Sequence, residues 1–102
     1  MSENLMVVAR ITARPGQEEN VKRALVGLVA PTRAEPGCVN YDLHQSHEDP
    51  AVFLFHENWA SRDALLSHDR SPHVQAFRAR AGELLTGPAL IELFRPVDVA
   101  GR

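Results

Sequence analysis

Apolar and polar residues alternate along four stretches of the chain, and the segments between them follow helical spacing. From residue 5 to 14 every second position is apolar, as expected for a strand with one buried face. The stretches 38–47, 51–59 and 89–96 are predicted to be strands as well. The polar run 46–50 between the second and third strands predicts a hairpin connection.

A long helix is predicted over residues 17–35. Its apolar positions recur at the spacing of one helical face: Val21, Ala24, Leu25, Leu28 and Val29. Pro31 is expected to kink this helix or to end its regular part. Ser61 is expected to cap a short helix to about residue 69, and Ser71 to cap a last one with Pro72 at its first position.

The predicted order is β-α-β-β-α-β, with the second helical part in two pieces. This is an α+β, ferredoxin-like split β-α-β fold with a four-stranded antiparallel sheet. A chain of 102 residues predicts one domain, with its core at about 5–96. Helices on one sheet face leave apolar side chains exposed on the other: Met6, Val8, Val52, Leu54, Leu90 and Phe94. We therefore expect a homodimer that packs sheet against sheet as a dimeric α/β barrel.

Composition excludes some function classes. Hydrophobic residues make up 44% of the chain, charged residues 24%, and the net charge is −2. The 11 basic residues form no stripe, so nucleic-acid binding is not expected. No apolar run approaches a membrane span, and the first residues do not resemble a signal peptide. The single cysteine, Cys38, fits a reducing, cytoplasmic location and a small buried side chain.

The third predicted strand carries the first candidate for chemistry. Phe53, Phe55, Glu57 and Trp59 share one face of it. A carboxylate in apolar surroundings has a raised pKa, which suits a general base, unless Glu57 serves only in a structural pair. Trp59 is either a core residue or a flat wall for a planar substrate.

Two histidines lie near predicted helix ends. His68 falls near the end of the short helix, and His73 falls at the start of the last one. Histidine titrates near neutral pH and is the usual general base, so His68 is either a catalytic residue together with Glu57 or an exposed polar residue in a connection. His73 either begins its helix in a purely structural role or contributes to substrate binding. Tyr41 either donates a hydrogen bond to a substrate oxygen or is a strand aromatic.

The sequence predicts neither a metal site nor a cofactor. His44 and His47 cannot share a strand face, and no carboxylate–histidine spacing typical of a metal site stands out. No Gly-rich phosphate loop, flavin fingerprint or haem-attachment motif is present.

Several of these residues recur in one known family. The motifs are Glu35-Pro36-Gly37-Cys38-x-x-Tyr41-x-Leu43, Phe55-x-Glu57-x-Trp59 and His68-x-x-Ser71-Pro72-His73. Together they resemble the antibiotic biosynthesis monooxygenases over about residues 5–96. That resemblance implies a small dimeric ferredoxin-like protein that oxidises quinol-like or polyphenolic compounds with O2, without metal or flavin. It implies His68 or Glu57 as the base, Tyr41 orienting a substrate oxygen, and Trp59, Phe55 and Phe77 lining the pocket.

The resemblance leaves alternatives open. The anthrone oxygenases have an asparagine where this chain has Phe55, and the haem-degrading branch has a histidine where it has Arg78. A second branch isomerises a small phosphorylated hydroxy-diketone, the processed autoinducer-2 signal, and resembles the chain about as well. A non-catalytic dimeric binding or stress-response domain is the third hypothesis. The sequence does not decide between an aromatic and a carbonyl substrate, nor between the two bases.

Overall fold

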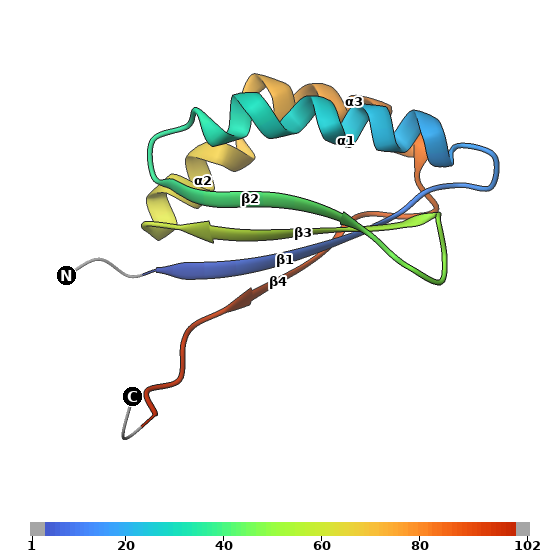
Figure 1. Ribbon diagram of the computed structural model, residues 1–102. Coiled ribbons are helices and arrows are strands. Elements are labelled where there is room, and N and C mark those ends of the chain that lie inside the picture. Colours follow the sequence, from blue (N-terminus) through green and yellow to red (C-terminus); the bar gives the residue numbers. More distant parts are fainter. Residues whose placement is uncertain (1–3, 100–102) are drawn as a thin grey trace.

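The computed structural model describes residues 4–99. Four strands and three helices follow one another along the chain (Figure 1). They are β1 (Leu5–Thr12), α1 (Glu18–Arg33), β2 (Cys38–Gln45), β3 (Val52–Trp59), α2 (Arg62–Asp69), α3 (Pro72–Leu84) and β4 (Leu90–Phe94). The predicted order is confirmed. Strands β1, β2 and β4 each end two residues before the predicted last residue, and β3 and β4 begin one residue later than predicted.

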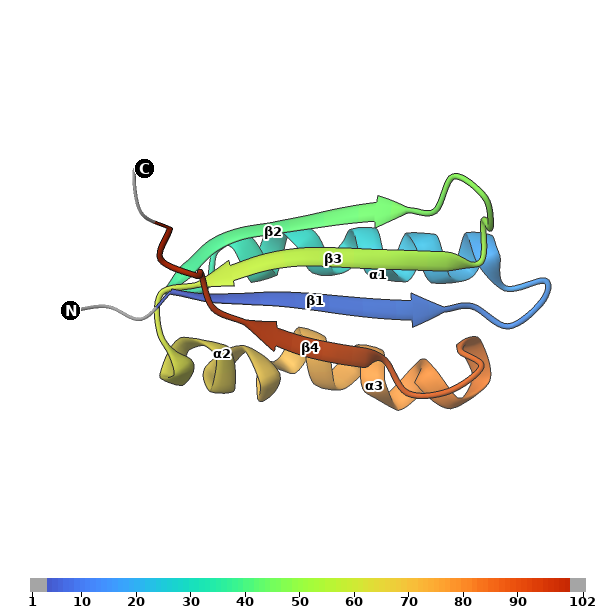
Figure 2. The ribbon, with the colours of Figure 1, turned by 90° about the horizontal axis from the view of Figure 1, so that it is seen from below.

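One antiparallel sheet holds all four strands in the order β2-β3-β1-β4. Its central strands pair Val7 with Glu57 and Ala9 with Phe55. The three helices lie together on one side of the sheet, and the other side is open (Figure 1). Seen from the open side, α2 and α3 flank the edge strand β4 (Figure 2). This is the ferredoxin-like α+β fold predicted from the sequence.

The core lies between the sheet and the helices, and it follows the predicted alternation. Val7 on β1, Phe55 and Trp59 on β3, and Val21 and Leu25 on α1 are almost fully buried. Among the described residues, the buried polar side chains are those of Thr32, Glu57 and His68. Two of these three were singled out from the sequence as candidate catalytic residues, and they lie inside the apolar layer.

The helix caps form as predicted. The Ser61 side chain accepts a hydrogen bond from the backbone N–H of Ala64, and the Ser71 side chain accepts one from that of Val74. α1 does not end at Pro31, which was one of the two expectations for this residue, but continues through it to Arg33. Pro31 lies in the last turn of the helix, and its missing N–H removes one backbone hydrogen bond there.

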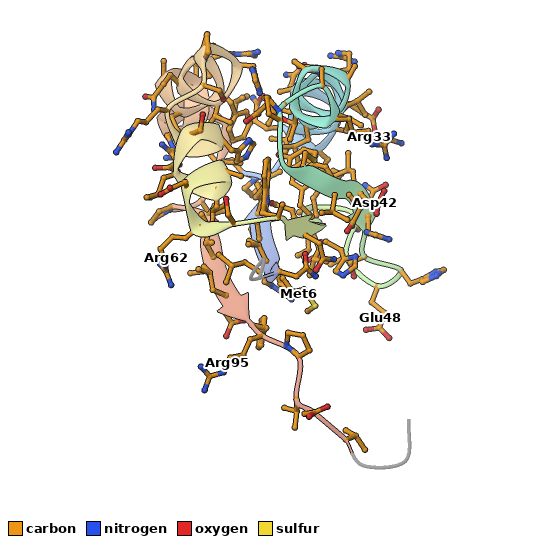
Figure 3. All side chains as sticks on the ribbon, turned by 90° about the vertical axis from the view of Figure 1, so that its left-hand side faces the viewer. Met6, Arg33, Asp42, Glu48, Arg62 and Arg95 are labelled. Atoms are coloured by element: carbon orange, nitrogen blue, oxygen red, sulfur yellow. The ribbon has the colours of Figure 1, made fainter. Side chains whose placement is uncertain are left out.

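The open face of the sheet mixes apolar and polar side chains. Leu90 is 63% and Phe94 is 44% exposed, while Met6 is only half-buried and points away from the helices (Figure 3). Beside them, Asn40 accepts from Asn58 at 2.7 Å and donates to Asp42 at 2.9 Å. Within residues 4–99, no helix has the length and apolar character that crossing a membrane requires.

Candidate active site

Two cavities lie between the sheet and the helices near the β4 edge. The larger has a volume of about 370 Å³, and its walls include Tyr41, Phe55 and Phe77. The smaller has a volume of about 230 Å³, and its walls include His68. Glu57 lines both cavities, together with Ala9 from β1 and Ile91 from β4. A buried carboxyl group therefore stands at the meeting point of two largely apolar spaces.

Glu57 is held by the side chain next along its own strand face. The indole Nε1–H of Trp59 donates to its Oε1 at 2.8 Å. Burial raises the pKa of Glu57 to about 7, because the low-dielectric surroundings disfavour the charged form. The Trp59 hydrogen bond opposes this shift, and the Glu35 charge adds to it. Such a carboxyl group can accept or donate a proton near neutral pH.

His68 belongs to a hydrogen-bonded cluster with a residue that sequence analysis did not assign to the site. Oε2 of Glu35 lies 2.8 Å from Nδ1 of His68 and 2.7 Å from Nε2 of His73. Glu35 comes from the connection between α1 and β2, whereas the histidines come from the end of α2 and the start of α3. All three side chains are at most about one-fifth exposed.

Gly37 allows the Glu35 connection to approach α2. Its φ of +85° is a left-handed conformation that favours glycine. A Cβ built on it would lie 2.6 Å from the Cβ of Ala64 on α2. The Gly37 carbonyl also accepts the Ala60 N–H at 2.8 Å, just before α2 begins. This contact holds the 34–38 turn against α2, the helix that carries His68.

Aromatic rings surround the two candidate catalytic groups. Tyr41 stacks on Phe55 with ring centroids 4.3 Å apart, and the His68 ring lies edge-on to Tyr41 at 5.4 Å. The indole of Trp59 lies 4.7 Å from the His68 ring. Burial, and after it the Glu57 charge, raises the pKa of the Tyr41 hydroxyl, so the phenol remains a hydrogen-bond donor.

The Glu35, His68 and His73 cluster has the composition of a metal site. Its three ligand-type atoms lie within 4.8 Å of one another. Two histidines and a carboxylate are ligands that suit an ion such as zinc. Around a tetrahedral ion with bonds of about 2.0–2.1 Å, however, the ligand atoms lie roughly 3.3 Å apart. The observed 2.7 and 2.8 Å separations are hydrogen-bond distances. We therefore describe the cluster as two hydrogen bonds to one carboxylate oxygen.

The predicted site residues divide into two groups. Four of them line the larger cavity: Tyr41, Phe55, Glu57 and Phe77. His68 joins Glu57 at the smaller one. Trp59 and His73 are not among the lining residues of either cavity: Trp59 is fully buried and bonded to Glu57, and His73 contacts Glu35.

Glu35 was not predicted as a site residue. It precedes a Pro-Gly turn, and nothing in the neighbouring sequence indicates that histidines 33 and 38 residues away bind it.

Proteins of similar sequence share this fold. PA3566 from Pseudomonas aeruginosa is 39% identical, with a TM-score of 0.91 over 96% of this chain and 98% of that one. Rv0793 from Mycobacterium tuberculosis, named as a candidate monooxygenase, is 40% identical over 98% of each sequence, and its structure superposes with a TM-score of 0.87. YcnE from Bacillus subtilis, named in the same way, is 31% identical over 82% of this chain and 88% of its own.

The family model described as antibiotic biosynthesis monooxygenase matches residues 4–80. That span contains β1 to β3, α2 and most of α3, and with them Glu35, Glu57, His68 and His73. Together with the 40% identity to the mycobacterial relative, the match identifies the chain as a member of the antibiotic biosynthesis monooxygenase family.

Proposed function

We propose that this protein is a cofactor-independent monooxygenase that oxidises a quinol-like or polyphenolic compound with O2. The observation that carries the proposal is the position of Glu57 and His68, two groups able to take up a proton, on the wall of one apolar cavity. The adjoining cavity of about 370 Å³ has aromatic walls suited to a planar ring. Family membership supports the reaction class.

The proposed reaction begins with loss of a proton from the substrate to the enzyme. The resulting electron-rich anion transfers one electron to O2, and the two radicals combine into a peroxide anion. This anion takes a proton back and then loses water, so one oxygen atom enters the product as a carbonyl group and the other leaves as water. The protein binds the ring, moves the proton and excludes bulk water.

We assign the proton transfer to His68 and the orientation of a substrate oxygen to Glu57 and Tyr41. Nδ1 of His68 is engaged by Glu35, and no hydrogen-bond partner occupies its Nε2 among residues 4–99. Trp59 holds one oxygen of Glu57, and the other has no such partner in the same range. Both groups thus have a free atom for a ligand in the cavity that they share.

Oxygen uptake by the purified, metal-free protein with a panel of quinols and anthrones tests the proposal. We expect uptake that scales with protein concentration and falls at least about 100-fold in His68→Ala. The exposed His47, in the β2–β3 connection, offers the control His47→Ala, which should retain full activity. Wild-type uptake that persists in both His68→Ala and Glu57→Gln would disprove the assignment of the base.

A second candidate function follows from two arginines near the smaller cavity. Arg62 lines that cavity and also an open hollow that Arg95 lines, and both side chains lie on the same side of the molecule (Figure 3). A basic pair beside a proton-transferring site would suit a small phosphorylated carbonyl compound. Isomerisation of a phosphorylated hydroxy-diketone, lost in Arg62→Gln but with no oxygen consumed, would favour this function over the first.

We also propose that the protein acts as a homodimer packed through the open face of its sheet. Leu90 and Phe94 are large apolar side chains left exposed on that face, beside the half-buried Met6 and Val8. Exposed apolar surface of this kind is typical of an interface. A second copy of the chain would bury these apolar side chains and would cover the sheet on the side that the helices leave open.

A further inference from the structure

We propose that Glu35 is a positioning residue that holds the neutral His68 ring in one tautomer, with the proton on Nδ1 and the free electron pair on Nε2. The effect on turnover rests on the proposed function, because only a base needs a particular nitrogen free. The tautomer itself does not depend on that function and is measured without any substrate.

The first step is the hydrogen bond between Glu35 and His68. Oε2 of Glu35 lies 2.8 Å from Nδ1 of His68. An ionised carboxylate only accepts hydrogen bonds, so the ring nitrogen facing it must carry the proton. A neutral imidazole has one N–H, and the nitrogen left without a proton is then Nε2.

The second step is the accessibility of Nε2. The His68 residue is only 8% exposed. Nε2 of His68 has no hydrogen-bond partner within residues 4–99. If it were fully buried, it would be a buried polar atom without a partner, but in that range the one such side-chain N or O atom is Oγ1 of Thr32. Nε2 of His68 is therefore not fully enclosed. His68 and Glu57 both line the smaller cavity, so on this proposal the cavity is where Nε2 meets a ligand.

The third step is what holds Glu35 in place. His73 donates to the same Oε2 at 2.7 Å, so two N–H groups from two helices fix one carboxylate oxygen. The Ser71 hydroxyl donates to the His68 carbonyl at 2.7 Å while its oxygen caps α3, which links the two histidines through a short, ordered connection. On the other side, the 34–38 turn is held against α2 through Gly37. Glu35 is thus oriented before any substrate binds.

The proton transfer follows from this arrangement. When Nε2 takes a proton from the substrate, the ring becomes an imidazolium that still donates from Nδ1 to the Glu35 carboxylate. The negative charge of Glu35 stabilises that cation at 2.8 Å, and the carboxylate itself takes up no proton. The proton on Nε2 remains available for return to the peroxide later in the reaction. Without Glu35, the neutral ring could carry its proton on Nε2, and Nε2 could then not accept a proton from the substrate.

Nitrogen NMR of the histidine rings tests the tautomer directly, in wild type and in Glu35→Ala, at a pH where the His68 ring is neutral. We expect the wild-type ring to show a protonated Nδ1 and an unprotonated Nε2, and Glu35→Ala, which has no acceptor for Nδ1–H, to show a mixture or the opposite tautomer. Glu83→Ala is the matched control, since Glu83 is exposed on α3, and it should leave the His68 signals unchanged. The wild-type spectrum alone decides the tautomer if the variant fails to fold.

Oxygen uptake supplies the second readout. If the monooxygenase function holds, Glu35→Ala should lower kcat by about 100-fold or more with little change in KM, because the substrate pocket is intact. An absence of turnover in the wild type would count against the proposed function and leave the NMR result standing. A wild-type ring protonated on Nε2, or a tautomer unchanged in Glu35→Ala, would overturn the positioning role. So would a transition metal that copurifies with the wild type and is absent from Glu35→Ala.

Discussion

The indole N–H of Trp59 donates to the carboxyl group of Glu57 at 2.8 Å, and the two residues are neighbours on one face of β3. Trp59 is fully buried and Glu57 is 4% exposed, so the bond lies in the apolar layer between sheet and helices. One carboxyl oxygen is therefore held by the protein, and Glu57 lines both cavities. Trp59 is not among the residues that line them, and it contacts the candidate site through Glu57.

We expect Trp59→Phe to raise the pKa of Glu57 above its wild-type value of about 7. The Trp59 hydrogen bond favours the charged form of the carboxyl group, and phenylalanine has no N–H to replace it. Carbon NMR of the glutamate carboxyl groups during a pH titration measures the shift. Phe53→Leu, on the same buried strand face without a hydrogen bond to Glu57, is the control. A Glu57 midpoint unchanged in Trp59→Phe would contradict this account of the hydrogen bond.

The free energy of unfolding should fall between about pH 4.5 and pH 7 because of Glu57. Its folded pKa of about 7 lies above the ordinary value of 4.5, so the folded state binds more protons than the unfolded state over this range. Stability from the neutral carboxyl group is complete below pH 4.5 and is lost as the pH rises through 7. The loss should be about 2–3 kcal/mol.

Urea denaturation across this pH range measures the loss, with Glu57→Gln as the comparison. The variant keeps a neutral amide at all pH values, so subtracting its profile removes the contribution of every other titrating group. Parallel profiles for wild type and Glu57→Gln would show that the carboxyl group is not buried in its neutral form.

Gly37→Ala should destabilise the protein by about 1–3 kcal/mol. The added methyl group would meet Ala64 on α2 in a backbone conformation that alanine disfavours. Gly27 in α1 is the matched control, because nothing lies within 4 Å of its built Cβ and alanine favours a helix. Chemical denaturation of both variants gives the comparison. Equal effects at the two positions would contradict the close approach of the 34–38 turn to α2.

Val8→Glu should weaken the proposed dimer. Val8 lies on the open sheet face between His56 on β3 and Glu92 on β4, so a new carboxylate there would repel Glu92 and oppose burial. Light scattering with size-exclusion chromatography at micromolar concentration should give a dimer for wild type and a monomer for the variant. Val26→Glu, on the exposed side of α1, should remain dimeric. A wild-type monomer would refute the sheet-to-sheet interface.

The alternation of apolar and polar residues correctly predicted the strands and their buried faces. On β3, the alternation of Phe53, Phe55, Glu57 and Trp59 with more exposed residues is a property of any pleated strand. This alternation alone places Glu57 on the same strand face as the buried Phe55 and Trp59. The caps at Ser61 and Ser71 are equally local, because each side chain bonds to a backbone N–H three residues along the chain.

The effect of proline on a helix, judged from the sequence alone, does not predict where α1 ends. Proline removes one hydrogen bond from a helix, but the apolar face of α1 is already packed against the sheet through Val21, Leu25 and Leu28. Packing of that face outweighs the lost bond, and α1 continues for two further residues. A rule based on neighbouring residues cannot include this packing energy.

Sequence patterns are enough to predict the order of the elements, the face on which each strand is buried, and the position of Glu57 within the apolar layer. These depend on side-chain alternation and capping, which act over a few residues. The contacts of Glu35 with His68 and His73, across 33 and 38 positions, and the cavities beside Glu57 arise when the elements pack in three dimensions. Those features depend on how the 34–38 turn, α2 and α3 pack together, and contacts between distant segments leave no periodic signal in the sequence.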